Sequence, residues 1–375
     1  MTDIGFVRAD MVPSRPAPIN TSGASAWIRK NLFASPLDGV LTVLGALFLL
    51  WVVPPIFNFV IGNAVGRNGT VEECRMESAG ACWAYIASEM EFFIYGFYDI
   101  AEQWRPNVVF ALGALLFFPL LIPSMPFKRI IAVLFLVVYP VVSYFLLMGG
   151  VFGLPVIHTE KWGGLLITLI ISVVGITLSF PLGIVLALGR QSKMPVIKTL
   201  CVAFIELIRA VPLITILFMA SIMLPLFMPQ GMTIDKLLRA LVGVTLFTSA
   251  YMAEVVRGGL QAIPRGQYEA GASLGLGYWQ RMYFIILPQA LKHVIPGIVS
   301  TFIALFKDTS LVYIVGMKDL LEAVKTKNDT ALEWQSANTA TTGYLFAAMV
   351  FWVFCFGMSR YSIYMERRLN TGHKR

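Results

Sequence analysis

The sequence is short of charge. Asp, Glu, Lys and Arg make up only 13% of its 375 residues, against about 25% in ordinary soluble domains, whereas 57% of the residues are hydrophobic. A soluble fold cannot bury so much apolar surface. The apolar residues also come in runs of about 20, which at 1.5 Å per helical residue cross a hydrocarbon core of ~30 Å. Composition therefore predicts an integral membrane protein.

Several motifs are missing as well. The chain has three His residues, no Cys/His cluster and no His-Glu-x-x-His, so we expect no metal site. It lacks Gly-x-x-x-x-Gly-Lys-Ser/Thr, the loop that cradles ATP phosphates. We therefore expect no cofactor in this chain, and any energy from ATP and Mg²⁺ must enter through a separate subunit.

The net charge of +8 does not indicate a nucleic-acid partner, because the cations lie in short connectors rather than along one basic face. No secretory signal peptide is visible in the sequence, and we expect none. Residues 1–26 are rich in Pro, Ser and Ala and have no apolar core, which predicts a disordered cytoplasmic tail.

The four cysteines are of two kinds. Cys201 and Cys355 lie inside apolar runs, as small core residues do. Cys74 and Cys82 lie in a polar loop and can form a disulfide if that loop faces an oxidising compartment. Two free thiols are the alternative.

What the sequence does contain is a series of apolar spans, and each must be helical because lipid offers no partner to a free backbone N–H. We predict an all-α membrane protein of about eight spans, at Leu37–Ile61, Val108–Pro123, Ile130–Met148, Gly164–Leu188, Leu200–Met228, Leu237–Val256, Leu291–Gly316 and Thr342–Ile363.

The placement of Lys and Arg sets the orientation. With the N-terminus inside, cytoplasmic segments hold about twice as many cations as outer ones, which predicts that both termini are cytoplasmic. The loop from Met317 to Thr341 opposes this count, because it carries three lysines and is assigned outside.

Two segments between spans are unusually long. In the first, from Asn63 to Pro106, the aromatic stretch Met90–Phe97 is predicted to lie along the outer interface. The second, residues 261–288, falls on the cytoplasmic side. There Pro264 can open a helix, and glycines at 275 and 277 stop it before a second short helix. Small residues at 270–273 would let another surface approach the first helix closely.

Residues 261–288 resemble a known family. Glu269-Ala270-Gly271, Gly275 and Ile285-Ile286-Leu287-Pro288 keep the spacing of the Glu-Ala-Ala motif in permeases of binding-protein-dependent ABC importers, with Gly271 in place of the second Ala. The resemblance implies a coupling helix that fits a groove on the ATPase subunit. Glu269 would engage the ATPase, flanked by Arg265 and Arg281; the alternative is that Glu269 only caps or solvates its own helix.

Further strings narrow the resemblance. Glu206-Leu-Ile-Arg209-Ala-Val-Pro212 resembles the family's Arg-Gly-Thr-Pro segment, and Lys307-Asp308-Thr309-Ser310-Leu311 matches its Lys-Asp-Thr-Ser-Leu. Together they resemble polar amino acid permeases over about Trp162 to Arg368. Two strings before that region, residues 80–84 and 102–106, resemble the longer general L-amino-acid (Aap/Bzt-type) permeases.

The resemblance implies an organisation of the chain. Residues 27–161 would form an extension with about three spans and a periplasmic loop, 162–368 a five-helix type I permease core containing the coupling loop 261–288, and 369–375 a cytoplasmic tail.

Ionisable residues inside spans are costly, commonly ~2.5–3.5 kcal/mol each, and so point to a partner or a wet cavity. Asp308 is expected to meet the substrate ammonium, beside Lys307 and hydroxyls and backbone groups freed at Thr309 and Ser310; the alternative is an internal Lys–Asp pair. Arg209 either captures the substrate carboxylate or forms a structural pair with Glu206, three residues away on one helix face.

The predicted function is the permease subunit of an ATP-driven amino acid importer in the bacterial inner membrane. Expected partners are an ATPase dimer, a second related permease, a periplasmic binding protein, membrane lipid and an L-amino acid. An ion-coupled secondary transporter is the alternative, although no convincing inverted repeat supports it. An intramembrane enzyme is disfavoured because Asp308 lacks a catalytic partner.

Overall fold

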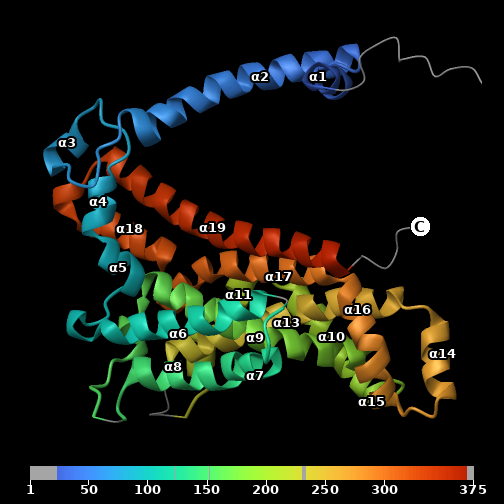
Figure 1. Cartoon of the computed structure of the whole chain (residues 1–375). Helices are drawn as coiled ribbons and strands as arrows, with labels where there is room; N and C mark the ends of the chain where they lie inside the picture. The colour runs from blue at the N-terminus through green and yellow to red at the C-terminus, as the bar shows by residue number, and fades with distance from the viewer. Residues whose placement is uncertain (1–22, 123, 152, 230–233, 370–375) are drawn as a thin grey trace, which may run out of the picture. The chain divides into compact units, whose positions relative to one another are not determined.

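The computed structural model describes residues 23–122, 124–151, 153–229 and 234–369, and these are largely helical (Figure 1). Contacts divide the chain into two compact units. The first consists of Met1–Ala64 with Ser78–Ala81, and the second of Val65–Glu77 with Cys82–Arg375.

The first unit contains α1 (Ala24–Leu32) and α2 (Pro36–Phe57), and α2 runs on through a wider turn to Gly62. Ser35 and Asp38 start α2 with a capping box: the Ser35 hydroxyl accepts a bond from the Asp38 N–H, and the Asp38 carboxylate accepts one from the Ser35 N–H. Helix α2 carries apolar side chains on all of its faces, and none of its residues is buried, as expected for a helix that faces lipid.

The predicted N-terminal tail overlaps this unit. Helix α1 begins inside residues 1–26, while residues 1–22, and 370–375 of the predicted C-terminal tail, lie outside the described residues.

The second unit holds the remaining helices. They are α3 (Val71–Arg75), α4 (Trp83–Ser88), α5 (Met90–Tyr95), α6 (Trp104–Leu121), α7 (Lys128–Val133), α8 (Tyr139–Met148), α9 (Gly164–Arg190), α10 (Pro195–Ala210), α11 (Leu213–Phe218), α12 (Leu224–Leu226), α13 (Lys236–Ala262), α14 (Arg265–Ser273), α15 (Tyr278–Arg281), α16 (Leu287–His293), α17 (Ile295–Asp308), α18 (Leu320–Thr330) and α19 (Ala337–Leu369), with a two-residue strand β1 (Lys318–Asp319).

Helices of membrane-spanning length confirm the predicted fold class. Within the described residues, seven continuous helical stretches are long and apolar enough to cross a bilayer, and one bent pair makes an eighth. Each overlaps one predicted span, because hydropathy over about 20 residues is set by composition alone. The predicted end of the second span, Pro123, lies outside the described residues.

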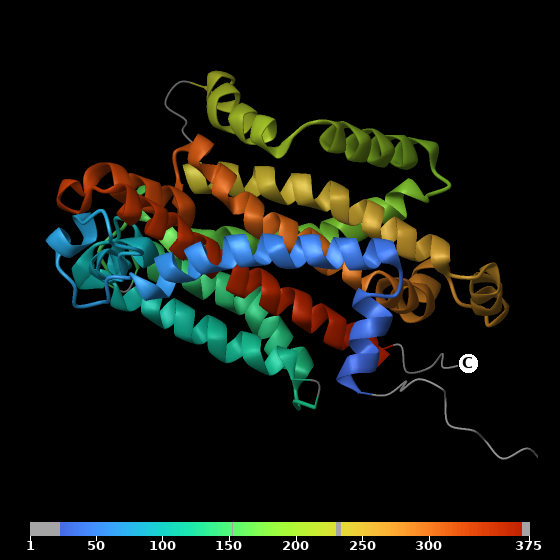
Figure 2. The ribbon, with the colours of Figure 1, turned by 90° about the horizontal axis from the view of Figure 1, so that it is seen from above.

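The fifth predicted span, Leu200–Met228, is wrong as a single helix. It consists of Pro195–Ala210 and Leu213–Leu226, which meet at an angle of 101°. Val211 is extended, as a residue before proline tends to be, and Pro212 has no N–H to continue the helix. Figure 2 shows this pair along one flank of the second unit.

The prediction for Met90–Phe97 is also wrong in part. The Phe93 ring is fully buried and contacts Phe346 and Tyr85, so this stretch packs into the protein rather than lying along an interface. Phe97 is half exposed, with the Lys318 ammonium 4.6 Å from its ring centroid. Amphipathic composition could not distinguish lipid contact from protein contact here.

Cys74 and Cys82 are joined by a disulfide. Next to it, the Arg75 guanidinium donates to the carbonyls of Leu332 and Glu333, and the Thr342 hydroxyl accepts the Cys82 N–H. The segment that carries the disulfide is thereby fixed to the connection between α18 and α19.

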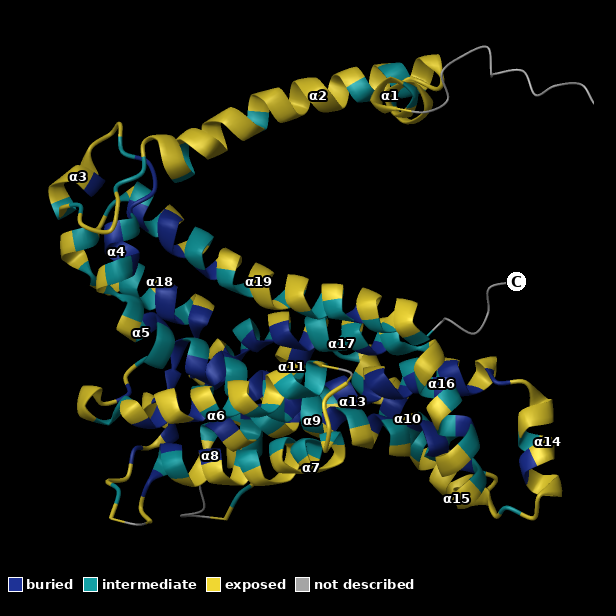
Figure 3. Cartoon of the chain, viewed as in Figure 1, coloured by how far each residue is buried: buried dark blue, intermediate teal, exposed yellow. Residues whose placement is uncertain are grey.

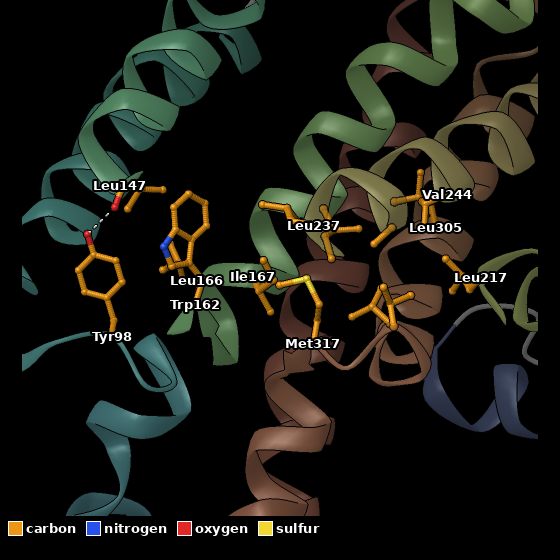
Figure 4. Packing of buried hydrophobic residues seen from close by; sticks show 14 of the residues in the cluster. Tyr98, Leu147, Trp162, Leu166, Ile167, Leu217, Leu237, Val244, Leu305 and Met317 are labelled. Carbon is orange, nitrogen blue, oxygen red and sulfur yellow. Dashed lines mark hydrogen bonds between the residues drawn. The ribbon is translucent and has the colours of Figure 1, made fainter. Parts of the chain in front are cut away.

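The centre of the second unit is the pair α9 and α13, which pack along their length (Figure 3). Gly183 permits the close approach, because a Cβ there would lie 2.6 Å from the Met252 side chain. One apolar cluster joins these helices to α6, α8 and α17, and the Tyr98 hydroxyl donates to the Leu147 carbonyl at its edge (Figure 4). A second apolar cluster packs the ends of α9, α10 and α13 where the ionisable residues gather, and it includes Ala187, Leu188, Ile205, Met252, Ala253 and Val256.

Candidate functional site

The loop between α13 and α16 has the predicted form of two short helices joined by a glycine turn. Helix α14 follows Pro264, whose missing N–H costs nothing at a helix start. Gly275 takes a φ of +76°, a left-handed conformation that glycine adopts without strain, and α15 begins after Gly277. The chain then re-enters the bundle through a wide turn and α16, whose first turn contains Pro288.

Three hydrogen bonds made by side chains hold α14 to its neighbours. The Tyr268 hydroxyl donates to the Leu260 carbonyl of α13, and the Arg281 guanidinium donates to the Tyr268 carbonyl. The Gln289 amide reaches Gln267 across the loop at 3.3 Å. Burial raises the pKa of Tyr268 above its ordinary value, so its hydroxyl stays a donor at neutral pH.

Gly271 does not have the role expected from its small size. It is the buried residue of α14, and a Cβ there would lie 2.6 Å from the Arg281 Cγ atom and 3.2 Å from Ile285. The residue therefore faces the second half of its own loop instead of an approaching surface. The arginine stem explains why glycine stands where the resembling motif has alanine.

The outer face of α14 is open. Arg265, Glu269, Ala270, Ala272 and Ser273 are all exposed. In the described part of the chain no ion pair involves Glu269, and the Arg281 head group turns to the Tyr268 carbonyl rather than to the Glu269 carboxylate. Beyond α14, Leu274, Trp279 and Tyr283 are also largely exposed. The loop thus presents a carboxylate and small side chains without neighbours of its own.

The Lys307–Ser310 string lies where α17 tightens into a 3₁₀ helix, Thr309–Val315. The predicted unwound turn is therefore a change of helix type. The Thr309 hydroxyl donates to the Phe306 carbonyl, and the Ser310 hydroxyl donates to the Lys307 carbonyl. Thr309 is buried and Asp308 is half-buried, whereas Lys307 is exposed. Among the described residues Lys307 and Asp308 form no ion pair.

Glu206 and Arg209 are not each other's partners. The Glu206 carboxylate lies 3.3 Å from the Arg190 guanidinium of α9, and Arg209 lies 3.7 Å from Glu254 of α13. The predicted structural pair on one face of α10 is thus replaced by contacts between helices. Arg209 also lies 5.5 Å from the ring centroid of Tyr251.

Glu254 is the centre of this cluster. Its Oε2 atom accepts bonds from Nε and Nη2 of Arg257 at 3.0 and 2.8 Å, and its Oε1 atom lies 2.9 Å from Nη1 of Arg190. The Glu254 side chain is only 15% exposed. The sequence does not reveal this cluster, because spacing within α13 does not show which helices lie beside Glu254 and Arg257.

Several known proteins are similar to this chain in sequence. The sequence model of the family described as binding-protein-dependent transport system inner membrane component matches residues 179–371. The inner membrane amino-acid ABC transporter permease protein YhdY of Escherichia coli is 50% identical over 361 residues, which are 96% of this chain and 97% of that protein.

A second relative, the glutamate/glutamine/aspartate/asparagine transport system permease protein BztC of Rhodobacter capsulatus, is 40% identical over an alignment of 440 positions that covers both chains in full. A crystal structure of an amino acid ABC transporter with histidines is 29% identical, covers 55% of this chain and 92% of that chain, and has a TM-score of 0.48.

Proposed function

This chain belongs to the family of binding-protein-dependent transport system inner membrane components, and we propose that it acts as the membrane-spanning permease of an ATP-driven L-amino-acid importer. It is a multi-pass inner-membrane protein. Its own part is to form the pathway and to receive motion, with ATP and Mg²⁺ bound by a partner ATPase.

The observation that carries the proposal is the open face of α14. A helix that leaves its carboxylate at Glu269 unpaired and exposes Ala270 and Ala272 has a surface suited to a groove on another protein. The helix is attached to α13 at Pro264 and through the Tyr268 hydroxyl, so a push on α14 acts on a span of the central pair. Arg265, Gly271, Gly275 and Pro288 shape this loop for coupling.

The pathway residues are proposed on a different basis. Lys307 and Asp308 are ionisable groups within a span, and a charge that faces lipid there is costly. We place Asp308 opposite the substrate ammonium, with Lys307, Thr309 and Ser310 beside it and Arg209 at the break between α10 and α11. Since the Thr309 and Ser310 hydroxyls already donate within their helix, they would act through their free lone pairs.

The orientation follows from charge. We propose that the side of the α13–α16 loop is cytoplasmic and that both termini lie on it, because the segments assigned to that side hold about twice as many Lys and Arg residues as the outer ones. Two ATPase copies would dock beneath this chain and a second related permease, and a periplasmic binding protein would dock above. The disulfide between Cys74 and Cys82 fits an oxidising outer compartment.

Glu269→Lys tests the docking role. In the complete importer in proteoliposomes, we expect binding-protein-stimulated ATP hydrolysis and uptake of radiolabelled L-amino acids to fall by about tenfold or more, because a reversed charge in a desolvated interface costs several kcal/mol. The thermal unfolding temperature of the permease should not change, since Glu269 is exposed.

Glu333→Lys, on an exposed glutamate between α18 and α19, is the matched control and should leave uptake unchanged. Normal uptake and normal recovery of the ATPase with the Glu269→Lys variant would reject the docking role.

A further inference from the structure

The charges around Glu254 do not balance. The cluster defined by Arg190, Glu206, Arg209, Glu254 and Arg257 has three guanidinium groups and two carboxylates, which leaves one positive charge. All of these residues belong to helices of membrane-spanning stretches. The cluster lies where α9 and α10 end, and its excess positive charge favours the binding of one further anion.

Arg209 is the member of the cluster that is free to bind that anion. Arg257 donates two hydrogen bonds to Glu254, but the Nη1 atom of Arg209 lies 3.7 Å from Oε2, beyond hydrogen-bond distance. Among the described residues, no hydrogen bond uses any donor of the Arg209 guanidinium. The side chain is 39% exposed, and its planar fork matches the two oxygens of a carboxylate.

The position of Arg209 in the fold supports a ligand rather than a further structural partner. It lies in the last turn of α10, directly before the 101° break at Val211 and Pro212. In transporters, substrate sites commonly lie at interrupted spans of this kind, because irregular backbone is tolerated within the membrane where it lines a cavity. Glu206, one turn earlier on α10, is 61% exposed on its side chain.

Resting on the proposed function, we infer that Arg209 binds the α-carboxylate of the transported amino acid and that Glu254 is its positioning residue. Glu254 attracts the guanidinium toward α13 without using its donors, and Arg190 and Arg257 hold Glu254 in place. The resting cluster lacks one carboxylate, which the substrate supplies.

Arg209→Lys is the direct test. The variant keeps the positive charge beside Glu254 but loses the planar guanidinium group. A site that binds a carboxylate through two hydrogen bonds is therefore weakened, whereas a purely electrostatic contact is kept. In the complete importer in proteoliposomes, we expect uptake of a mixture of radiolabelled L-amino acids to fall by about tenfold. Uptake at the wild-type rate overturns the inference.

The positioning role of Glu254 needs a variant that leaves the total charge unchanged. Glu254→Gln combined with Arg257→Gln removes one charge of each sign and keeps similar volumes. We expect uptake to fall by about threefold or more, because Arg209 is no longer attracted toward α13. Wild-type uptake by this double variant overturns the role of Glu254. The matched control, Glu322→Gln with Lys325→Gln, removes a pair on α18 whose Lys325 side chain is 53% exposed and whose Glu322 side chain is 25% exposed, and it should leave uptake unchanged.

Assembly and function are separated by two further measurements. If Arg209→Lys does not assemble with its partners, Arg209→Gln with Glu254→Gln repeats the test at constant total charge. Wild-type uptake then contradicts the inference, and a loss of about tenfold supports it. If the wild-type complex assembles but moves no amino acid with ATP, the proposed function fails instead, whatever the variants do.

Discussion

Helices α14 and α18 are both short and both lie outside the membrane-spanning stretches, yet they are held very differently. Helix α18 buries Leu320, Ala323 and Val324 and is capped by the Asp319 carboxylate, which accepts the N–H groups of Leu321 and Glu322. Helix α14 buries only Gly271, and no side chain caps it.

The difference indicates that α18 is fixed within the protein, whereas α14 is available to bind another protein. The Tyr85 hydroxyl donates to Asn328 of α18, and Lys327 pairs with Glu89 at 2.6 Å, so α18 has side-chain ties to the segment before α6. The side-chain ties of α14 come from its own loop, the end of α13 and the start of α16. A helix whose outward face has no internal partner is suited to an external one.

Truncating one apolar side chain within α18 and one directly after α14 should produce the largest difference in stability. Val324→Ala leaves a cavity where the side chain meets Gly343 and is expected to lower the free energy of unfolding by about 2–3 kcal/mol. Leu274→Ala, directly after α14, should change it by less than about 0.5 kcal/mol because Leu274 is 76% exposed. Thermal unfolding of the purified importer measures both; equal losses would remove the distinction.

Substitution of two glycines within α14 tests how this helix is held by its own loop. Gly266→Ala should slow hydrogen exchange of the α14 amides, since alanine favours a helix by about 1 kcal/mol and nothing lies within 4 Å of the new methyl group. Gly271→Ala brings the same gain but forces the Arg281 stem away, so it should speed exchange at the turn around Gly275. Slower exchange in both variants would show that Arg281 does not pack against α14.

A pH series on α18 should give the smallest effect. Burial raises the pKa of Asp319 to about 6, against about 4 when unfolded. A carboxyl with a raised pKa stabilises the folded state fully below the unfolded value, and that contribution is lost as the pH rises through about 6.

Asp319→Asn does not titrate and keeps one oxygen to cap α18. The unfolding temperature of the wild type, relative to this variant, should therefore fall by a few degrees between pH 4.5 and 7. A constant difference over that range would contradict the raised pKa.

The sequence predicted those features that depend on local composition. Runs of apolar residues located every span, and the prolines and glycines of residues 261–288 predicted the two short helices of the loop. The bend at Pro212 was missed, although the proline is visible in the sequence, because averaged hydropathy does not register a change of direction.

Features that depend on packing were out of reach. Spacing paired Glu206 with Arg209, whereas the fold brings in Arg190 and Glu254 from other helices. The aromatic stretch Met90–Phe97 suits lipid as well as protein, and only the tertiary structure buries Phe93. Gly271 was assigned to the outer face of its helix because the sequence does not show that Arg281 covers it.

Thiol labelling of α14 tests the central claim most directly. Ala272 is exposed, and Ala272→Cys in a chain with Cys201 and Cys355 replaced by serine supplies a single reactive thiol outside the disulfide. A membrane-impermeant maleimide should label this thiol in inside-out vesicles stripped of the ATPase, should fail to label it in intact cells, and should label it more slowly once the ATPase is restored. Labelling from the outside of intact cells would contradict the docking role of α14.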